Sequence, residues 1–357
     1  MSLDFTSRLH LVSRRVAMLL MAGAAAASFS AAPASAEEPD LSDVTLNVGI
    51  FQEVQFLQIA LTDHFKDTPY KIEWVRLNGA GGTMQALGAG AIDLSWGLSD
   101  VAVPNASALD VAPWTADTAP LKHIALLAPL DAAAYPSHVI VANTASGITA
   151  LDQVAGHSYT YQEGGNSAAA ALLALKSVGL TADDVDITLI PADSIPASVI
   201  SGAVDVATVQ WAQIQEALDD GTVTRLASSY EAGFPGYTSI TARTQSIEDP
   251  KKSAAIADFL TRATAYSNWR VDHLEAVAQT YVEAQQLNPD QAARAAASAA
   301  TTIVPLVAGG EGVKIQTELQ DALFASGFLA REVDYSQLYD DRFADAIEAG
   351  EALGATE

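Results

Sequence analysis

The sequence predicts an α/β protein built from two lobes. Short apolar runs of strand length alternate with segments of helical periodicity, which is typical of sheets whose strands are mostly parallel. Residues 37–357 number 321, which is more than a single hydrophobic core usually serves. Two short motifs also occur twice, in the same order and at similar spacing. Together these observations predict two related α/β units.

The first unit has the order strand, helix, strand, helix, strand. Residues 44–50 (VTLNVGI) read as a strand, and residues 53–65 follow with helical spacing of their apolar side chains. Residues 71–77 form a second predicted strand, and a Gly-rich corner leads into a helix around 84–87. Residues 91–96 complete the unit as a third strand.

The second unit has the same order. Strands are predicted at 158–162, 186–190 and 204–209. An Ala- and Leu-rich helix at 167–178 and a short helix at 195–201 connect them.

Two motif pairs relate the units to each other. Phe51-Gln52-Glu53 ends the first strand of one unit, and Tyr161-Gln162-Glu163 ends the matching strand of the other. Further along the chain, GAIDL at 90–94 corresponds to GAVDV at 202–206. The offsets of 110 and 112 residues agree in order and spacing, which favours two related lobes over chance similarity.

The chain after about residue 240 is predicted to be helical. One long helix is expected over 253–285, and Asn288 followed by Pro289 marks the start of another. The acidic, Ala-rich C-terminus predicts a terminal helix that fades into a tail. The expected division is therefore lobe 1 at 37–136, lobe 2 at 137–240, a helical return to lobe 1 at 241–340 and a tail at 341–357.

The first 36 residues predict a secretory signal peptide. Arg8, Arg14 and Arg15 precede the apolar stretch 16–27, and Ala34-Ser35-Ala36 is a small-residue cleavage pattern. We expect cleavage after Ala36 and export to the periplasm. The arginine pair leaves both twin-arginine export and an ordinary signal open.

Composition excludes several classes of function. Residues 37–357 contain 15 basic and 42 acidic residues, a net charge of −27, which argues against nucleic acid and anionic membranes as partners. The sequence has no cysteine, so disulfides, thiolate chemistry and a lipid-anchored cysteine are excluded, and we expect a protein free in the periplasm. The six histidines show no metal-ligand spacing. We therefore predict neither a metal site nor a cofactor.

Catalytic motifs are also missing from the sequence. It contains no G-x-S-x-G, H-E-x-x-H or Gly-rich loop followed by Lys-Ser/Thr. Gly79-Ala80-Gly81-Gly82 resembles part of a dinucleotide fingerprint, but Met84 stands where the third glycine belongs. The sequence thus favours binding over catalysis.

The candidate binding residues are polar or glycine residues that follow predicted strands. In open α/β sheets, ligands bind beyond the carboxyl ends of the strands, where helix N-termini offer free N–H groups. Helix capping by Thr83 and Ser99, and turn formation by the glycines, are alternatives; Trp96 or Trp211 could stack on a ligand or pack between lobes. The candidates are Gln52, Thr83, Ser99 and Asp100 in lobe 1, and Gln162, Gly164, Gly165, Asn166, Ser167, Gln210 and Trp211 in lobe 2.

From about residue 45 to 339 the chain resembles the periplasmic binding proteins for aliphatic sulfonates, taurine and nitrate, above all the aliphatic sulfonate branch. The matching stretches include KIEWVRLNGAG at 71–81, MQALGAGAIDL at 84–94, YQEGGNSAAAALLALKSVGL at 161–180 and IPADSIPASVISGAVDV at 190–206. The resemblance implies a monomeric two-lobed type II periplasmic binding protein. Its lobes would be joined by crossover strands near 137–142 and 236–243, with Arg243 matching the family's crossover arginine.

The resemblance implies the substrate-binding subunit of an ABC importer, working with a membrane permease and a cytoplasmic ATPase. Two departures fall in the expected pocket: Gln210-Trp211 replaces a Trp-Asp pair, and Gly97-Leu98-Ser99-Asp100 is one residue longer than the usual turn. The predicted ligand is an aliphatic sulfonate or taurine-like anion. Nitrate, a thiamine precursor, riboflavin, a periplasmic enzyme of the thiamine-precursor group and a sensory receptor domain stay open as alternatives.

Overall fold

The structure is a computed structural model that describes residues 39–354; the predicted signal peptide and the last three residues lie outside this part. Its larger sheet, sheet A, has six strands in the order β11-β4-β10-β3-β1-β2. β1, β2 and β3 are parallel, β10 is antiparallel to both β3 and β4, and β11 is antiparallel to β4. The strands are β1 (Thr45–Ile50), β2 (Lys71–Arg76), β3 (Leu94–Ser99), β4 (Leu121–Pro129), β10 (Thr238–Arg243) and β11 (Thr301–Val304).

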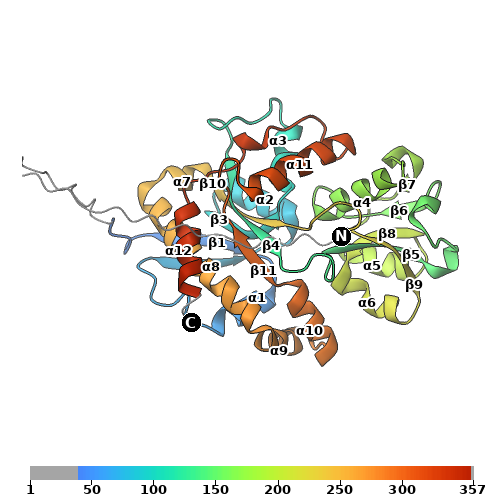
Figure 1. Ribbon diagram of the computed structural model, residues 1–357, viewed down its shortest axis with the longest axis horizontal. Coiled ribbons are helices and arrows are strands. Elements are labelled where there is room, and N and C mark those ends of the chain that lie inside the picture. Colours follow the sequence, from blue (N-terminus) through green and yellow to red (C-terminus); the bar gives the residue numbers. More distant parts are fainter. Residues whose placement is uncertain (1–38, 355–357) are drawn as a thin grey trace, which may run out of the picture. The chain divides into compact units, whose positions relative to one another are not determined.

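Sheet B has five strands in the order β7-β6-β8-β5-β9. β6, β7 and β8 are parallel, and β5 is antiparallel to its neighbours β8 and β9. Figure 1 shows these strands grouped apart from those of sheet A. They are β5 (His138–Asn143), β6 (Ser158–Thr160), β7 (Asp186–Ile187), β8 (Val206–Gln210) and β9 (Val223–Ser228).

The chain passes between the two sheets twice. Residues 130–137 connect β4 to β5, and residues 229–237 connect β9 back to β10. Sheet A therefore contains strands from both halves of the chain, whereas sheet B is formed by one continuous stretch. We call the parts built on sheets A and B lobe 1 and lobe 2; this two-lobed α/β architecture confirms the predicted fold class.

Helices cover the sheets of both lobes. None of the helices in residues 39–354 combines the length and apolarity that a membrane span requires. Lobe 2 carries α4 (Asn166–Ser177), α5 (Ile195–Ile200) and α6 (Trp211–Asp219). The remaining helices are α1 (Glu53–Ala60), α2 (Gly79–Ala89), α3 (Ala102–Leu109), α7 (Thr244–Glu248), α8 (Pro250–Asp272), α9 (Leu274–Gln285), α10 (Pro289–Ser298), α11 (Glu311–Ala325) and α12 (Ala344–Gly354). Short 3₁₀ turns span Thr144–Ser146, Leu151–Gln153, Ala182–Asp184, Ala192–Ser194 and Tyr335–Gln337.

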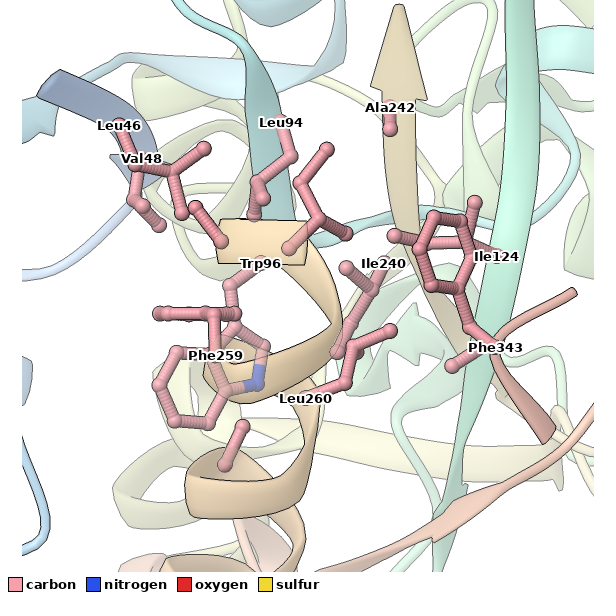
Figure 2. Packing of buried hydrophobic residues seen from close by; sticks show 14 of the residues in the cluster. Leu46, Val48, Leu94, Trp96, Ile124, Ile240, Ala242, Phe259, Leu260 and Phe343 are labelled. Carbon is pink, nitrogen blue, oxygen red and sulfur yellow. The ribbon is translucent and has the colours of Figure 1, made fainter. Parts of the chain in front are cut away.

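The core of lobe 1 lies between sheet A and α8. Figure 2 shows Phe259 and Leu260 of α8 facing strand residues that include Trp96. The Trp96 ring lies 5.7 Å from Phe259, measured between ring centroids, and only 6% of the residue is exposed. Its packing follows from a strand that continues to Ser99 instead of ending at residue 96 as predicted. Trp96 is therefore a core residue and is not available to stack on a ligand.

A β-bulge at Gly97 lies within β3, which begins and ends three residues later than predicted. The pairing of β10 with β3 shifts between Ser239 and Ile240, and Gly97 has a φ of +100°, a conformation that glycine adopts readily. The extra residue expected in a turn is thus absorbed within the strand. The bulge places Ser99 at the strand's carboxyl end.

The C-terminal region differs from the prediction in two ways. The helix expected over 253–285 is interrupted at His273, whose ring stacks on Trp269 at 4.5 Å, and β11 is a strand in a region predicted to be helical. The predicted terminal helix is present as α12, and it packs against α8: a Cβ on Gly350 would lie 2.3 Å from the Thr261 carbonyl oxygen. The predicted start of α10 is confirmed, because Asn288 Oδ1 accepts a hydrogen bond from the Gln291 amide at 2.9 Å.

Candidate ligand-binding cleft

The candidate site lies where the strand ends of sheet A meet those of sheet B. In lobe 1, Ser99 ends β3 at the same edge as the first residue of β10, since Ser99 pairs with Thr238. In lobe 2, Gln210 ends β8, which runs parallel to the neighbouring strand β6. The carboxyl ends of the parallel strands are where open α/β sheets bind ligands.

The two lobes touch through polar groups at these edges. The Ser99 hydroxyl donates a hydrogen bond to Oδ1 of Asn166, the first residue of α4. Asn166 Nδ2 in turn donates to the Tyr237 carbonyl oxygen at 3.1 Å. Asn166 therefore connects lobe 2 to β3 and to the second crossover of the chain.

The turn before α4 is shaped to expose the N-terminus of that helix. Gly164 has a φ of +75°, and Gly165 occupies the N-cap position with no side-chain hydrogen bond to the first turn. The buried Ser167 hydroxyl accepts a hydrogen bond from the backbone N–H of Gln162 at 3.2 Å and donates one to the Thr208 carbonyl at 3.0 Å. Ser167 thus fixes the turn with its side chain, so it can offer a ligand only its backbone N–H.

A second helix N-terminus faces this turn from lobe 1. α2 begins at Gly79, and its N-cap residue Asn78 makes no side-chain capping bond. A Cβ on Gly79 would lie 3.5 Å from Gln162 Nε2, and a Cβ on Gly165 would lie 4.0 Å from the Ala80 Cβ and 3.8 Å from the Ser99 hydroxyl oxygen. These are ordinary van der Waals distances, so the start of α2 and the turn before α4 lie in contact across the cleft.

The N-termini of α2 and α4, one from each lobe, therefore lie close together. Each helix N-terminus carries about half a positive charge, so two that face one another repel unless negative charge lies between them. Hydrogen-bond donors surround the same space: the Ser99 hydroxyl, the Gln162 amide group and the N–H groups of the α4 first turn. Such an arrangement suits a small oxyanion without a basic side chain.

Thr83 and Asp100 are turned away from this space into lobe 1. Thr83 is fully buried, and its hydroxyl donates to the Gly79 carbonyl at 3.0 Å, within α2. Asp100 is also fully buried, and its Oδ2 accepts from Gln316 Nε2 at 2.6 Å. Burial raises the pKa of the Asp100 carboxyl to about 7, although its hydrogen bonds favour the charged form.

Gln52 follows the carboxyl end of β1, and Gln210 and Trp211 lie at the carboxyl end of β8. Gln52 and Gln210 are exposed N-cap residues of α1 and α6. The half-buried Trp211 ring lies 5.7 Å from the ring of Tyr135, which belongs to the first crossover. Trp211 also lines a groove between α6 and α10, together with Arg294.

Arg243 is not near the other candidates. It ends β10, which runs antiparallel to β3, so it lies at the opposite edge of sheet A from Ser99. Its guanidinium packs against Gly90 and donates to Gln245 Oε1 at 2.9 Å. The direction of β10 accounts for this placement, which separates Arg243 from the other candidate residues.

Sequence reasoning missed two contributors to the site. The start of α2 at Gly79 and Ala80 was overlooked in favour of the residues that follow it, although the glycine run after β2 signals close backbone approach. The Tyr237 carbonyl carries no sequence signal, because a backbone acceptor is available at any residue. Among residues 39–354, no group of three His, Asp or Glu side chains is placed to hold a metal ion.

Comparison with known proteins first defines the class of fold. The alkanesulfonate-binding protein SsuA from Xanthomonas axonopodis pv. citri, solved with MOPS bound, superposes with a TM-score of 0.68 at 19% identity, covering 87% of this chain and 99% of that one. The nitrate-binding protein NrtA from Synechocystis PCC 6803 gives a TM-score of 0.64 at 13% identity, covering 89% and 90%. The desulfurization enzyme DSZB gives 0.59 at 14% identity, covering 85% and 99%. The chain has the periplasmic-binding-protein fold.

Residues 119–269, which include all of sheet B, match the family described as NMT1/THI5 like. No curated protein sequence matches the chain significantly. The predicted resemblance to the sulfonate- and nitrate-binding proteins is confirmed in the fold and in this family match.

Proposed function

We propose that the protein is the substrate-binding subunit of an ABC importer and captures a small organic anion between its lobes. The observation that carries this proposal is the convergence of two uncapped helix N-termini, α2 and α4, on one polar space. Sulfonate- and nitrate-binding proteins share the fold. An aliphatic sulfonate or taurine-like compound is the ligand we favour.

The sulfonate oxygens are held by donors from both lobes. The N–H groups of residues 165–167 approach from lobe 2, and the Ser99 hydroxyl approaches from lobe 1. Ser99 then donates to the ligand in place of Asn166 Oδ1, and Gln162 Nε2 supplies a further donor. Because donors come from opposite sides, a bound oxyanion links the two lobes, and hinge closure of the cleft follows.

The organic part of the ligand lies against Trp211. This ring is half-buried at the first residue of α6, at the same sheet edge as Gln162. An indole ring contributes contact area without a charge, so it tolerates different organic groups.

We propose binding without catalysis. An enzyme of the thiamine-precursor group is the main alternative, because the family match and the desulfurization enzyme leave that class open. The sequence contains no cysteine to serve as a nucleophile. Nitrate, a thiamine precursor or riboflavin would keep the transport role and change the ligand class.

Export and delivery belong to the same proposal. The protein is cleaved after Ala36, acts as a monomer in the periplasm and delivers its ligand to an inner-membrane permease coupled to a cytoplasmic ATPase. Cell fractionation followed by N-terminal sequencing tests the first step: a periplasmic chain that begins at Glu37 supports it, and an uncleaved chain in the cytoplasm contradicts it.

A thermal-shift screen tests the ligand class. The panel contains taurine, alkanesulfonates, aryl sulfonates, nitrate, sulfate, thiamine precursors and riboflavin, in buffers free of sulfonate. A ligand at 100 times its Kd adds about 2.7 kcal/mol of stability and raises Tm by several degrees. A shift with a heterocycle alone would replace the sulfonate in this proposal.

Replacing Gln162 and Asn166 together by Ala tests the site. Charge-assisted hydrogen bonds contribute about 1.5–3 kcal/mol each, so affinity should fall at least about tenfold. Arg243→Ala is the matched control. It removes a polar side chain at the end of β10 that lies away from Ser99, so affinity should be unchanged. Unchanged affinity in the double variant would show that the ligand binds elsewhere.

A further inference from the structure

The buried carboxyl group of Asp100 belongs to the residue that follows Ser99 of the proposed anion site. Asp100 follows Ser99, whose hydroxyl reaches Asn166 across the cleft. The residue is 0% exposed, and Gln316 Nε2 is the side-chain donor to its Oδ2. Its Oδ1 has no partner of good hydrogen-bond geometry among the described residues, although the backbone N–H groups of Asp100 and Val101 also favour the charged carboxylate. A carboxylate this poorly solvated is costly to keep charged.

The titratable groups that face Asp100 do not offset its charge. Tyr335, on the 3₁₀ turn beside α11, interacts electrostatically with Asp100, and its hydroxyl lies 2.8 Å from Nδ1 of His123 on β4. Burial lowers the pKa of His123 to about 3 and raises the pKa of Tyr335 well above its usual value, so both are neutral near pH 7. No described cation therefore stabilises the Asp100 carboxylate.

The groups toward the cleft are neutral or negative as well. Tyr237 has its pKa raised by burial, and by the charges of Glu311 and Asp100. Its carbonyl accepts the hydrogen bond from Asn166, so it borders both the proposed site and Asp100. Glu311, at the start of α11, is the second carboxyl group on this side of the site.

We propose that Asp100 takes up a proton from solvent when an anion binds at Ser99 and Asn166, so that capture of the ligand is linked to pH. The inference rests on the proposed anion site and adds its regulation. An anion placed one residue from a buried carboxylate repels it, and protonation removes that repulsion. No covalent change is involved: the water or buffer acid that supplies the proton becomes its conjugate base.

The size of the effect follows from linkage. Free Asp100 titrates near pH 7 because of its burial, and a bound anion raises its pKa further. If the bound anion raises the pKa of Asp100 by one unit, the anion binds about tenfold more weakly at a pH well above this range than at a pH well below it. This follows because the coupling between proton and anion binding is reciprocal. Affinity is highest in mildly acidic solution and declines as the pH rises through neutrality.

Isothermal titration calorimetry with ethanesulfonate tests the proposal. Titrations at pH 7.5 in Tris, imidazole and triethanolamine, which carry no sulfonate and differ in ionisation enthalpy, report the protons exchanged on binding. We expect uptake of a fraction of a proton by the wild-type protein, and its loss in Asp100→Asn. Glu311→Gln, which removes the other nearby carboxyl group, should retain the uptake.

Each result has one meaning. Binding without proton uptake, or uptake that persists in Asp100→Asn, overturns this inference and leaves the proposed function intact. Failure of every sulfonate to bind overturns both. If Asp100→Asn does not fold, Gln316→Leu replaces it: removing the donor to Oδ2 should move the pH range of uptake upward, and an unmoved range contradicts the role of Asp100.

Discussion

The two lobes use the same strand-end aspartate in different surroundings. In lobe 1, Asp93 Oδ2 accepts from the Asn47 amide at 3.0 Å; in lobe 2, Asp205 Oδ2 accepts from the Ser158 amide at 3.2 Å. Each aspartate precedes the third parallel strand of its unit and bonds to the first, and the two occupy corresponding places in the repeated motifs. The side chain of Asp93 is 3% exposed and that of Asp205 is 37% exposed.

The difference comes from what the C-terminal region adds to lobe 1. Asp93 is covered by Lys252 of α8 and Ser246 of α7, whereas Asp205 has only the partly exposed His157 as an ionic partner. Lobe 1 also packs large aromatic residues around Phe259, while α4 of lobe 2 is lined by small residues. The comparison teaches that the repeat supplies the frame of each lobe, and the non-repeated helices make lobe 1 the more deeply packed one.

The small residues of α4 have a use of their own. Ala169, Ala170 and Leu173 pack with Leu319 and Leu323 of α11, next to the crossover residue Phe234. This apolar contact joins the lobes beside the cleft, as the adjacent positions of α4 and α11 in Figure 1 show. It anchors the helix whose N-terminus forms the proposed site.

The largest expected effect on stability is Phe259→Ala. Phe259 is fully buried against Trp96, and deletion of a buried Phe costs about 3–5 kcal/mol. Urea unfolding followed by tryptophan fluorescence measures the loss, with Leu109→Ala, an exposed leucine, as control. A loss below about 1 kcal/mol would mean that α8 does not organise the core of lobe 1.

Asp93→Asn and Asp205→Asn test the comparison directly. Asp93→Asn removes the charge of a buried carboxyl group that bonds to the partly exposed Lys252 and should cost about 2 kcal/mol, whereas the exposed pair in lobe 2 should cost less than about 1 kcal/mol. Equal losses in urea unfolding would break the distinction between the lobes.

Both aspartates should also respond to acid in the same direction. Burial disfavours charge on Asp93, but hydrogen bonds from Asn47, Lys252 and Ser246 outweigh it and lower its pKa; the Asp205 pKa is also lowered. Their stabilisation is present above the unfolded pKa of about 4 and is lost as the pH falls below it.

Asp100→Asn should have the opposite pH dependence. The folded Asp100 titrates near pH 7 and the unfolded one near 3.8, so the folded state binds more protons between these values and wild-type stability falls as the pH rises. The variant removes this decline, and the difference in Tm between variant and wild type should grow by several degrees from pH 4 to pH 8. Parallel Tm curves would contradict the placement of Asp100.

A small loss of stability is also predicted for Gly164→Ala. Its φ of +75° disfavours a side chain, so stability should fall by about 1 kcal/mol, although a Cβ would meet no atom within 4 Å. Gly81→Ala, at an exposed position in α2 with equal space, should not reduce stability. A neutral Gly164→Ala would show that the turn before α4 relaxes freely.

Much of this architecture could be predicted from local pattern. The strand at Thr45–Ile50 and the helix at Asn166–Ser177 deviate by one residue from the predicted ranges, because each has regular periodicity and a turn at its boundary. β3 was predicted too early, since the bulge at Gly97 breaks the alternation of side chains. The interruption between α8 and α9 at His273 could not be predicted, because no Gly or Pro marks it in the sequence.

Some residues of the candidate site could also be predicted from local pattern, and others could not. Ser99, Gln162 and Asn166 could be predicted to meet, since each follows a parallel strand. Asp100 was predicted to face the cleft, but its side chain is buried in lobe 1. Successive side chains of an extended chain point to opposite sides, so the residue after Ser99 is expected to point away from the cleft. The position of Arg243 depends on the antiparallel insertion of β10, which no local pattern reveals.

A calorimetric titration with ethanesulfonate and with its neutral analogue ethanesulfonamide tests the central claim most directly. The two compounds have nearly the same size, but only the sulfonate carries the charge that two converging helix N-termini and the Ser99 hydroxyl favour. We predict binding of the sulfonate at least about tenfold tighter than that of the sulfonamide. Equal affinities, or binding of the sulfonamide alone, would contradict an anion site between the lobes.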